Sequence, residues 1–196
     1  MGCRYPVKWG GRNMDWVSTC MVMEEIGVLG YIFACVFGVG AELVCDAIIL
    51  HGNDEQKEKY VKPLLKGELF AAECLTEPRG GSDFFGASSR AEDKGDHFLV
   101  RGVKRFIVGA EEADFFLAYV RTNMADAAPA HERISTMIID RGPGVEVKSL
   151  YGLMGADRKD PIVSVLPVDD LEEEKNLVFL TRMGLMKRTR LSEFSN

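Results

Sequence analysis

The sequence predicts an α+β fold in which a helical amino-terminal part precedes an antiparallel β-barrel or β-sandwich domain. Two observations support this. Apolar residues recur at helical spacing in the first third of the chain, as at Trp16, Cys20 and Met23. After residue 68 the pattern changes to short apolar runs separated by turn residues, with no helical pattern between them. Runs of this kind are typical of antiparallel β structure.

Three helices are expected. The first contains the Trp16–Gly27 stripe. The second, Tyr31–Leu50, is apolar on most sides and should lie between other helices. It is not expected to span a membrane, because Glu42 and Asp46 would be costly in a bilayer. The third begins at Asn53, with Gln56 placed to complete a capping box, is interrupted at Pro63 and stops before Gly67.

Six strands are expected in the second part of the chain. A hairpin turn at Asp93–Asp96 should join two of them. Residues 122–133 form a polar loop, Asp169–Lys175 a solvated acidic loop, and 179–196 a tail with little apolar periodicity. The predicted domains are therefore 1–69, 70–178 and the tail. The expected strands are Leu69–Leu75, His97–Val100, Val103–Val108, Phe115–Val120, Ile134–Ile139 and Val145–Leu150.

Composition excludes several classes of protein. The 196 residues include 24 basic and 30 acidic side chains, and a net charge of −6 argues against duplex nucleic-acid binding. With 46% hydrophobic and 28% charged residues, the chain is neither disordered nor fibrous. Five cysteines without a CxxC motif predict reduced, buried thiols in a cytosolic setting. Three scattered histidines predict no metal site.

The most informative segment is Leu75–Asp83, which reads Leu-Thr-Glu-Pro-Arg-Gly-Gly-Ser-Asp and follows a predicted strand. Pro78 fixes a turn, and the adjacent glycines allow close approach of the backbone to a ligand. Successive amides with the Ser82 hydroxyl form a possible anion-binding nest for a pyrophosphate, and the Thr76 hydroxyl can bond a polar ring edge. An isolated motif of this type would more often be a simple β-turn, but other motifs accompany this one in the sequence.

Those companions occur in a fixed order along the chain. With the Thr-Glu-Pro segment they resemble the acyl-CoA dehydrogenase family of flavoenzymes, over residues 5 to 178. They are Tyr5–Gly11 (Tyr-Pro-Val-Lys-Trp-Gly-Gly), Glu24–Gly27 (Glu-Glu-Ile-Gly), His51–Lys57 (His-Gly-Asn-Asp-Glu-Gln-Lys) and Val100–Val108 (Val-Arg-Gly-Val-Lys-Arg-Phe-Ile-Val).

The resemblance implies FAD as cofactor and an acyl-CoA thioester as substrate. Ser82 would also lie near the CoA portion of the substrate. Phe106 and Val108 depart from the family pattern, which commonly has Trp and then Thr or Ser there. Lys104, Glu77 and Asp83 are expected to fix the local fold rather than to act in catalysis. The implied cofactor-binding residues are Glu73, Cys74, Leu75, Thr76, Gly81, Ser82, Phe106, Ile107 and Val108.

The family's catalytic base is a glutamate in a carboxy-terminal helical domain, to which no residue here matches. The resemblance therefore implies a chain truncated at both ends, with negligible turnover on its own. The complete enzyme would pass electrons to an electron-transfer flavoprotein, form a homo-oligomer, and lie in the cytoplasm, or in the mitochondrial matrix of a eukaryote. Two alternatives stay open: a non-catalytic binding module with the same fold, and a flavin oxidase or monooxygenase.

Overall fold

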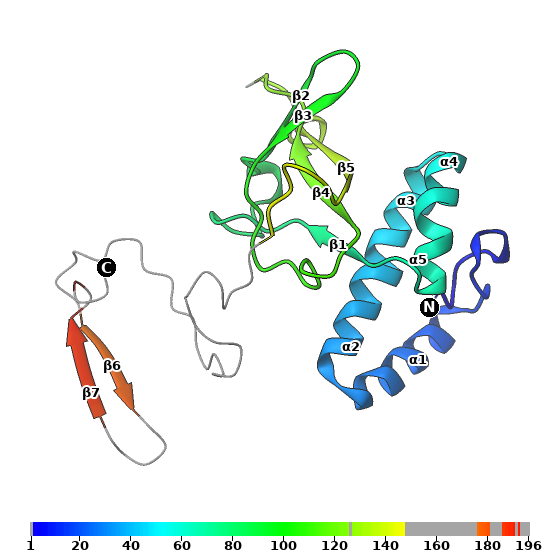
Figure 1. Cartoon of the computed structure of the whole chain (residues 1–196), viewed down its shortest axis with the longest axis horizontal. Coiled ribbons are helices and arrows are strands. Elements are labelled where there is room, and N and C mark those ends of the chain that lie inside the picture. The colour runs from blue at the N-terminus through cyan, green and yellow to red at the C-terminus, as the bar shows by residue number, and fades with distance from the viewer. Residues whose placement is uncertain (1, 126, 148–175, 181–185, 191, 193–196) are drawn as a thin grey trace. The chain divides into compact units, whose positions relative to one another are not determined.

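The computed structural model describes residues 2–125, 127–147, 176–180, 186–190 and 192. The chain divides into two compact units, Met1–Lys148 and Ser149–Asn196. The first unit contains a group of helices and a sheet (Figure 1). The second contains a two-stranded antiparallel hairpin of β6 (Asn176–Leu180) and β7 (Met186–Arg190), of which β6 begins before the predicted tail of 179–196 and β7 lies within it. The predicted acidic loop at 169–175 lies outside the described residues.

The helical part begins with α1 (Trp16–Leu29), whose N-cap Asp15 accepts a hydrogen bond from the Ser18 amide. A second helical run lies on the side of the helical part that is nearer to the sheet. It consists of α2 (Tyr31–Val36), a π-helical segment (Phe37–Val44) and α3 (Cys45–His51). The two expected helices are thus present, with Gly30 between them.

The third helical run comprises α4 (Asp54–Gln56), a π-helical segment (Lys57–Val61) and α5 (Lys62–Lys66). The predicted capping box is confirmed, because the Asn53 side chain accepts from the Gln56 amide and the Gln56 side chain accepts from the Asn53 amide. The predicted interruption at Pro63 is wrong. Pro63 lies in the first turn of α5, where its missing N–H is tolerated, and the run ends at Gly67 in the left-handed conformation.

The apolar run Tyr31–His51 is more exposed than expected. By length and composition alone it is long and apolar enough to cross a membrane, and 29% of its most apolar window is buried in the described structure. Phe37, Val44 and Ile48 are buried, whereas Tyr31 and Leu50 are exposed. The run therefore packs along one side and leaves its first turns uncovered.

The β part is an open, mixed sheet, which corrects the predicted antiparallel barrel or sandwich. The central strand β4 (Phe115–Arg121) pairs antiparallel with β5 (Ile134–Asp140). On its other side β4 pairs parallel with β1 (Ala71–Cys74), and the Asp114 amide donates to the Phe70 carbonyl oxygen just before the two strands begin.

The rest of the sheet is a hairpin of β2 (Arg90–Asp93) and β3 (Phe98–Arg101), which touches β4 at Arg90 and Arg121. The predicted turn at Asp93–Asp96 joins these two strands. The segment 103–108 is not a strand, and neither is the described part of the predicted strand 145–150. The proposed domain boundaries stay predictions.

Strand β4 separates two hydrophobic clusters because its side chains alternate between the faces of the sheet. Phe115 and Leu117 pack with the helices, in a cluster that includes Val44, Val61 and Leu64. The opposite face carries Phe116, Ala118 and Val120, which pack with Ala72, Cys74, Ala91 and Ala113. The sheet thereby holds the ends of β1 and β4 in a fixed place next to the helical part.

The predicted buried thiols are only partly confirmed. Cys3, Cys45 and Cys74 are buried, Cys35 is half-buried and Cys20 is exposed on α1. All five are free thiols. Burial raises the pKa of Cys45 to about 12, so this thiol stays protonated near neutral pH.

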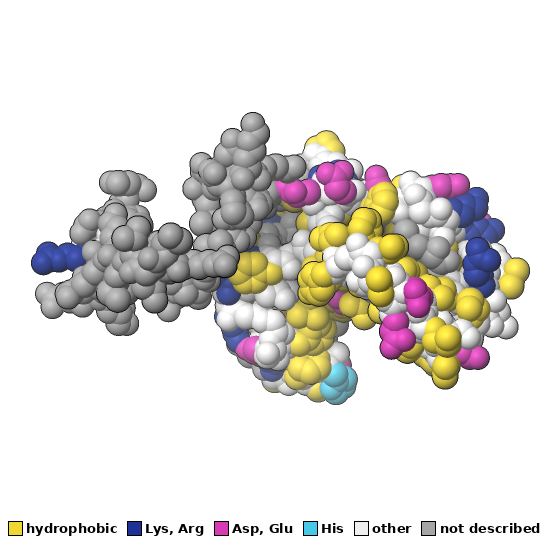
Figure 2. Space-filling model, turned by 90° about the horizontal axis from the view of Figure 1, so that it is seen from below, with side chains coloured by type: hydrophobic (Ala, Val, Ile, Leu, Met, Phe, Trp, Pro, Cys, Tyr) yellow, Lys and Arg dark blue, Asp and Glu magenta, His cyan; other side chains and the backbone are white. Residues whose placement is uncertain are grey.

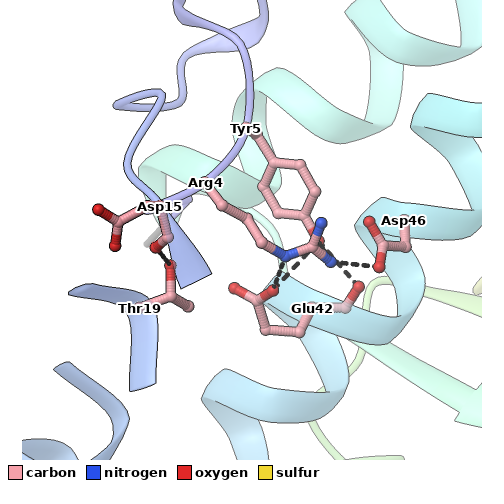
Figure 3. A network of polar contacts seen from close by, with 6 residues as sticks. All are labelled: Arg4, Tyr5, Asp15, Thr19, Glu42 and Asp46. Atoms are coloured by element: carbon pink, nitrogen blue, oxygen red, sulfur yellow. Dashed lines mark hydrogen bonds and ion pairs between the residues drawn. The ribbon is translucent and has the colours of Figure 1, made fainter. Parts of the chain in front are cut away.

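Two acidic side chains of the long apolar run hold the amino-terminal segment (Figure 3). Glu42, only 8% exposed, accepts a hydrogen bond from Arg4 Nε at 2.6 Å, and Arg4 also pairs with Asp46. The Tyr5 hydroxyl donates to the Glu42 carbonyl oxygen at 2.9 Å. These carboxylates are four residues apart and so lie on one face of the run. A single arginine thus pairs with both carboxylates within the protein and offsets part of their charge.

We expect Arg4→Met to lower the free energy of unfolding by about 3 kcal/mol, because it leaves two partly buried carboxylates without their cation. Urea denaturation at pH 7 measures this loss. Lys8→Met is the matched control, since Lys8 pairs with Asp54 at 3.7 Å on the surface and its removal should have a far smaller effect. Equal losses in both variants would contradict the proposed role of Arg4.

Candidate functional site

Two segments meet at the carboxyl end of β1 and form the candidate site. One is the loop 75–86, which contains the Thr-Glu-Pro motif, and the other is 104–108, which follows β3. The Arg105 amide donates to the Thr76 carbonyl oxygen at 2.9 Å, and Lys104 Nζ donates to the Leu75 carbonyl oxygen at 3.2 Å. The two stretches that were predicted from the sequence as site segments are about thirty residues apart along the chain. The structure therefore brings them together.

A buried ion pair fixes this junction. Lys104 Nζ lies 2.9 Å from Glu77 Oε1 and also donates to the Tyr119 carbonyl oxygen on β4 at 2.6 Å. The Glu77 side chain is 3% exposed, and it also accepts hydrogen bonds from the amides of Ser88 and Ser89. Both carboxylate oxygens and the ammonium group are therefore satisfied within the protein.

The electrostatics of Glu77 follow from these bonds. Burial alone would raise the pKa of its carboxyl group, but hydrogen bonds from Ser88, Ser89 and Lys104 outweigh burial and hold the pKa well below its ordinary value. Glu77 is thus ionised at neutral pH and fully engaged. This geometry supports the expected structural role of Glu77 and Lys104.

The loop after Glu77 is closed by its own hydrogen bonds. The Glu77 and Gly80 backbones exchange bonds of 3.1 and 2.9 Å, while Arg79 pairs with Asp83 and donates to the Gly86 carbonyl oxygen at 3.0 Å. Asp83 accepts from the Gly86 amide at 3.1 Å and caps the short 3₁₀ turn Phe84–Gly86. A small hollow lies against this loop, lined by Leu75, Glu77, Arg79, Gly80, Gly81, Asp83, Phe84, Gly86 and Ala87.

Thr76, Gly81 and Ser82 lie on the ligand-accessible part of the loop. Ser82 is exposed, and Leu75, Thr76 and Gly81 are half-buried. A Cβ on Gly81 would lie 3.0 Å from the Thr76 Oγ1 atom, closer than a side chain normally tolerates. Glycine here leaves space beside the threonine hydroxyl and allows the backbone to approach a ligand closely, which agrees with the anion-nest hypothesis.

The second segment presents an aromatic ring. Phe106 has a positive φ of 57°, which is rare for a residue with a side chain, and its ring is 65% exposed. The Arg105 guanidinium carbon lies 4.9 Å from the ring centroid. Ile107 packs into the core below, and Val108 is partly exposed beside Phe106. The unusual backbone at Phe106 turns an apolar face outward next to Thr76.

Glu73 and Cys74 complete the predicted set and point in opposite directions, as successive residues of a strand do. Cys74 is buried in the core, where burial raises the pKa of its thiol to about 11, so only its backbone is available to a ligand. Glu73 Oε1 accepts a hydrogen bond from the Tyr119 hydroxyl at 2.8 Å, and the edge of the Phe84 ring lies against Tyr119.

Three residues of this network were missed from the sequence: Ser88, Ser89 and Tyr119. Tyr119 was recognised only as part of a strand. The adjacent serines gave no signal, because their bonds reach back 11 and 12 residues to Glu77.

The donor set fits a large ligand with an aromatic ring and an anionic group. Phe106 and Val108 supply apolar surface, Thr76 supplies a hydroxyl, and Gly81 and Ser82 supply backbone amides with a further hydroxyl. The clearance above Gly81 is the observation that carries this fit, since any side chain there would close on Thr76. A flavin dinucleotide has both a planar ring and a pyrophosphate, and these residues match its chemistry.

Comparison with known proteins identifies the family. Residues 1–68 match the acyl-CoA dehydrogenase N-terminal domain, and residues 72–165 match the acyl-CoA dehydrogenase middle domain. The chain belongs to the acyl-CoA dehydrogenase family.

Individual relatives agree with this. The chain is 32% identical over 156 residues to the mitochondrial isovaleryl-CoA dehydrogenase of Pongo abelii, covering 79% of this chain and 37% of that protein. It is 33% identical to the caffeyl-CoA reductase-Etf complex subunit CarC of Acetobacterium woodii, covering 97% of this chain and 51% of that protein. The chain thus spans about half or less of the length of these relatives.

A solved structure shows the same fold with a cofactor. The acyl-CoA dehydrogenase from Bacillus anthracis, complexed with FAD, superimposes with a TM-score of 0.61 at 33% identity, covering 71% of this chain and 23% of that one. The predicted recognition of the family is therefore confirmed, and so is its helical part followed by a β part.

Acid should destabilise the protein partly through Glu77. Because its folded pKa lies below the unfolded value of about 4.3, its contribution to stability is present above that pH and lost below it. We expect the free energy of unfolding to fall more steeply between about pH 5 and pH 3 in the wild type than in Glu77→Gln. Urea denaturation across this range measures the difference.

The matched control is Glu92→Gln, which removes a surface carboxylate paired with Lys94. Its acid dependence should stay close to that of the wild type. A Glu77→Gln variant with an unchanged slope would show that Glu77 does not carry the effect.

Proposed function

We propose that this chain supplies the FAD and acyl-CoA contacts of an enzyme that dehydrogenates an acyl-CoA thioester between its α and β carbons. The single observation that carries the proposal is the junction of Thr76 and Gly81 with the outward-facing Phe106 ring, in a chain of this family. When bound, FAD supplies the acceptor for the hydride that leaves the β carbon.

The roles proposed for this chain's own residues follow from their chemistry. The Phe106 ring and Val108 cover one part of the isoalloxazine ring, and the Thr76 hydroxyl bonds its polar edge. The amides of Gly81 and Ser82, with the Ser82 hydroxyl, hold the pyrophosphate, and Ser82 also lies near the CoA portion. Glu73, Leu75, Cys74 and Ile107 support these groups through their backbone and packing. We assign the catalytic base to no residue of this chain.

Val108 is a position at which this site differs from the family pattern. The corresponding position of the family pattern commonly carries a hydroxyl, and here the side chain is apolar and partly exposed. A flavin bound here would lose one side-chain hydrogen bond, and the Val108 amide would remain as donor. We therefore expect a change in flavin tuning rather than a loss of binding.

The reverse reaction is a second candidate. One relative is named a caffeyl-CoA reductase and covers nearly the whole of this chain. The same ring and thioester contacts would serve reduction of an α,β-unsaturated acyl-CoA, because the two directions share their transition state. Product analysis from saturated and unsaturated thioesters with the complete enzyme distinguishes the directions.

The partners follow from the same proposal. The name of that relative includes an Etf complex, which supports an electron-transfer flavoprotein as electron acceptor or donor. We also propose a homo-oligomer for the complete enzyme, located in the cytoplasm or, in a eukaryote, in the mitochondrial matrix.

Gly81→Ala tests the flavin contact. The added Cβ would press on the Thr76 hydroxyl, so we expect the affinity for FAD to fall about tenfold with little change in the thermal midpoint. Titration of FAD fluorescence against the purified chain measures the affinity. Gly142→Ala is the control, since nothing lies within 4 Å of its Cβ, and it should bind FAD like the wild type.

A wild-type chain that stays colourless and leaves FAD fluorescence unchanged would contradict flavin binding and favour a non-catalytic module. Rapid reaction of the reduced flavin with oxygen to give peroxide would favour an oxidase or monooxygenase instead.

Turnover by the isolated chain should be negligible. We expect no more than background reduction of an artificial electron acceptor with butyryl-CoA or isovaleryl-CoA, because no residue is assigned as base. A dye-reduction assay with added FAD measures this. Rates comparable to those of a complete family member would show that the chain contains its own base.

A further inference from the structure

Arg79 is a cation that lines the hollow beside the loop 75–86. Its Nη2 atom pairs with Asp83, and its Nη1 atom donates to the Gly86 carbonyl oxygen at 3.0 Å. A Cβ on Gly86 would lie 2.5 Å from Nη2, so glycine leaves room there for the guanidinium group. The arginine side chain is therefore held against the loop by both of its outer nitrogens.

The guanidinium group keeps hydrogen-bond donors that these contacts do not use. It has five N–H groups, of which the contacts with Asp83 and Gly86 occupy two. The others have no acceptor in the described part of the chain. The backbone amides of Gly81 and Ser82, which follow Arg79 closely in the loop, likewise donate to no described residue. This stretch of the loop therefore has an excess of donors.

The carboxylates that line the hollow are already paired. Both oxygens of Glu77 accept hydrogen bonds within the protein, including one from Lys104 at 2.9 Å. One oxygen of Asp83 accepts from the Gly86 amide at 3.1 Å, and the other pairs with Arg79. Each carboxylate thus has a cation as its partner. The carboxylate acceptors of the hollow are occupied, whereas part of the donors of Arg79 are not.

Unused donors beside a cation favour a ligand that carries negative charge and acceptors. Phosphate groups have this chemistry, and arginine binds them through two parallel N–H groups. The binding has to be local, because the chain carries a net charge of −6. Figure 2 shows the lysine and arginine side chains of one face in small separate groups, with acidic side chains near them. A well-placed arginine therefore contributes more to the binding of an anionic ligand than the general surface charge does.

We propose that Arg79 is a binding residue for a pyrophosphate group, which it holds together with the Gly81 and Ser82 amides. FAD and CoA both contain such a group, so either is its source. Arg79 supplies the positive charge that the amides lack, while Asp83 keeps the guanidinium in place. The Arg79 and Asp83 side chains are 58% and 57% exposed, so their ion pair is weak enough for a phosphate to share the guanidinium. The proposal rests on the proposed function and adds a charged contact to its neutral ones.

Titration of the full chain with two pairs of ligands tests this role. FAD contains the pyrophosphate that riboflavin lacks, and dephospho-CoA contains the one that pantetheine lacks. Flavin fluorescence measures the first pair, and isothermal titration calorimetry measures the second. We expect Arg79→Met to weaken binding of FAD, of dephospho-CoA or of both about tenfold, and to leave riboflavin and pantetheine unchanged. An arginine that only shaped the loop would affect both members of a pair alike.

Two further variants separate the charge from its geometry and its place. Arg79→Lys keeps the positive charge but loses the paired N–H groups, so it should recover part of the affinity. Arg90→Met is the matched control, because Arg90 is 53% exposed and also pairs with a carboxylate, that of Glu92, at 3.8 Å. It should bind every ligand like the wild type. Higher salt should weaken binding of the affected ligand more in the wild type than in Arg79→Met, because salt screens the charge.

The affected ligand identifies the source of the pyrophosphate. A loss for FAD alone assigns Arg79 to FAD, and a loss for dephospho-CoA alone assigns it to CoA. Unchanged binding of both by Arg79→Met would overturn the proposal, and so would an equal loss for riboflavin or pantetheine. If the wild type binds FAD and Arg79→Met binds it equally well, the proposed function stands without Arg79. A wild type that binds neither FAD nor dephospho-CoA contradicts the proposed function as well.

Discussion

The buried ion pair between Glu77 and Lys104 is the constraint on which the candidate site depends. Lys104 reaches the end of β1 through the Leu75 carbonyl and the middle of β4 through the Tyr119 carbonyl. Glu77 reaches the segment before β2 through Ser88 and Ser89. One pair of charges therefore ties three strands and two loops together. Since a buried charge without its partner is strongly unfavourable, this arrangement has few low-energy alternatives.

Much of this structure could be predicted from local sequence signals. The Asn53 capping box, the Gly67 helix end and the continuous apolar run of β4 follow from rules that act within a few residues. The two site segments were also recognised, because Pro78, the paired glycines and the Lys104–Val108 stretch have distinctive residues in a fixed order. The sequence therefore predicted these structural elements and site segments, and the order in which they occur along the chain.

The remaining features depend on contacts between distant residues. The parallel pairing of β1 with β4 joins residues 44 positions apart, such as Ala71 and Phe115, so the sequence pattern alone suggested an antiparallel domain. Strand β2 was missed because three of its four residues are charged. The predicted strand at 103–108 fails because Lys104 turns inward to Glu77 and Phe106 adopts a positive φ. Neither the inward turn of Lys104 nor the positive φ of Phe106 can be predicted from a local sequence pattern.

The site divides its charged and neutral residues between two tasks. The charged side chains form ion pairs with one another and hydrogen bonds with backbone groups. The ion pairs join Glu77 to Lys104 and Arg79 to Asp83, and the Glu73 carboxylate accepts a hydrogen bond from the Tyr119 hydroxyl. The neutral groups left to face a ligand are two hydroxyls, backbone amides and an aromatic ring, which bind and orient but do not remove a proton. A site of this kind holds a cofactor and a thioester in place. These groups bind and orient a ligand, which is why the proposed function assigns binding to this chain and leaves the base for proton transfer unassigned.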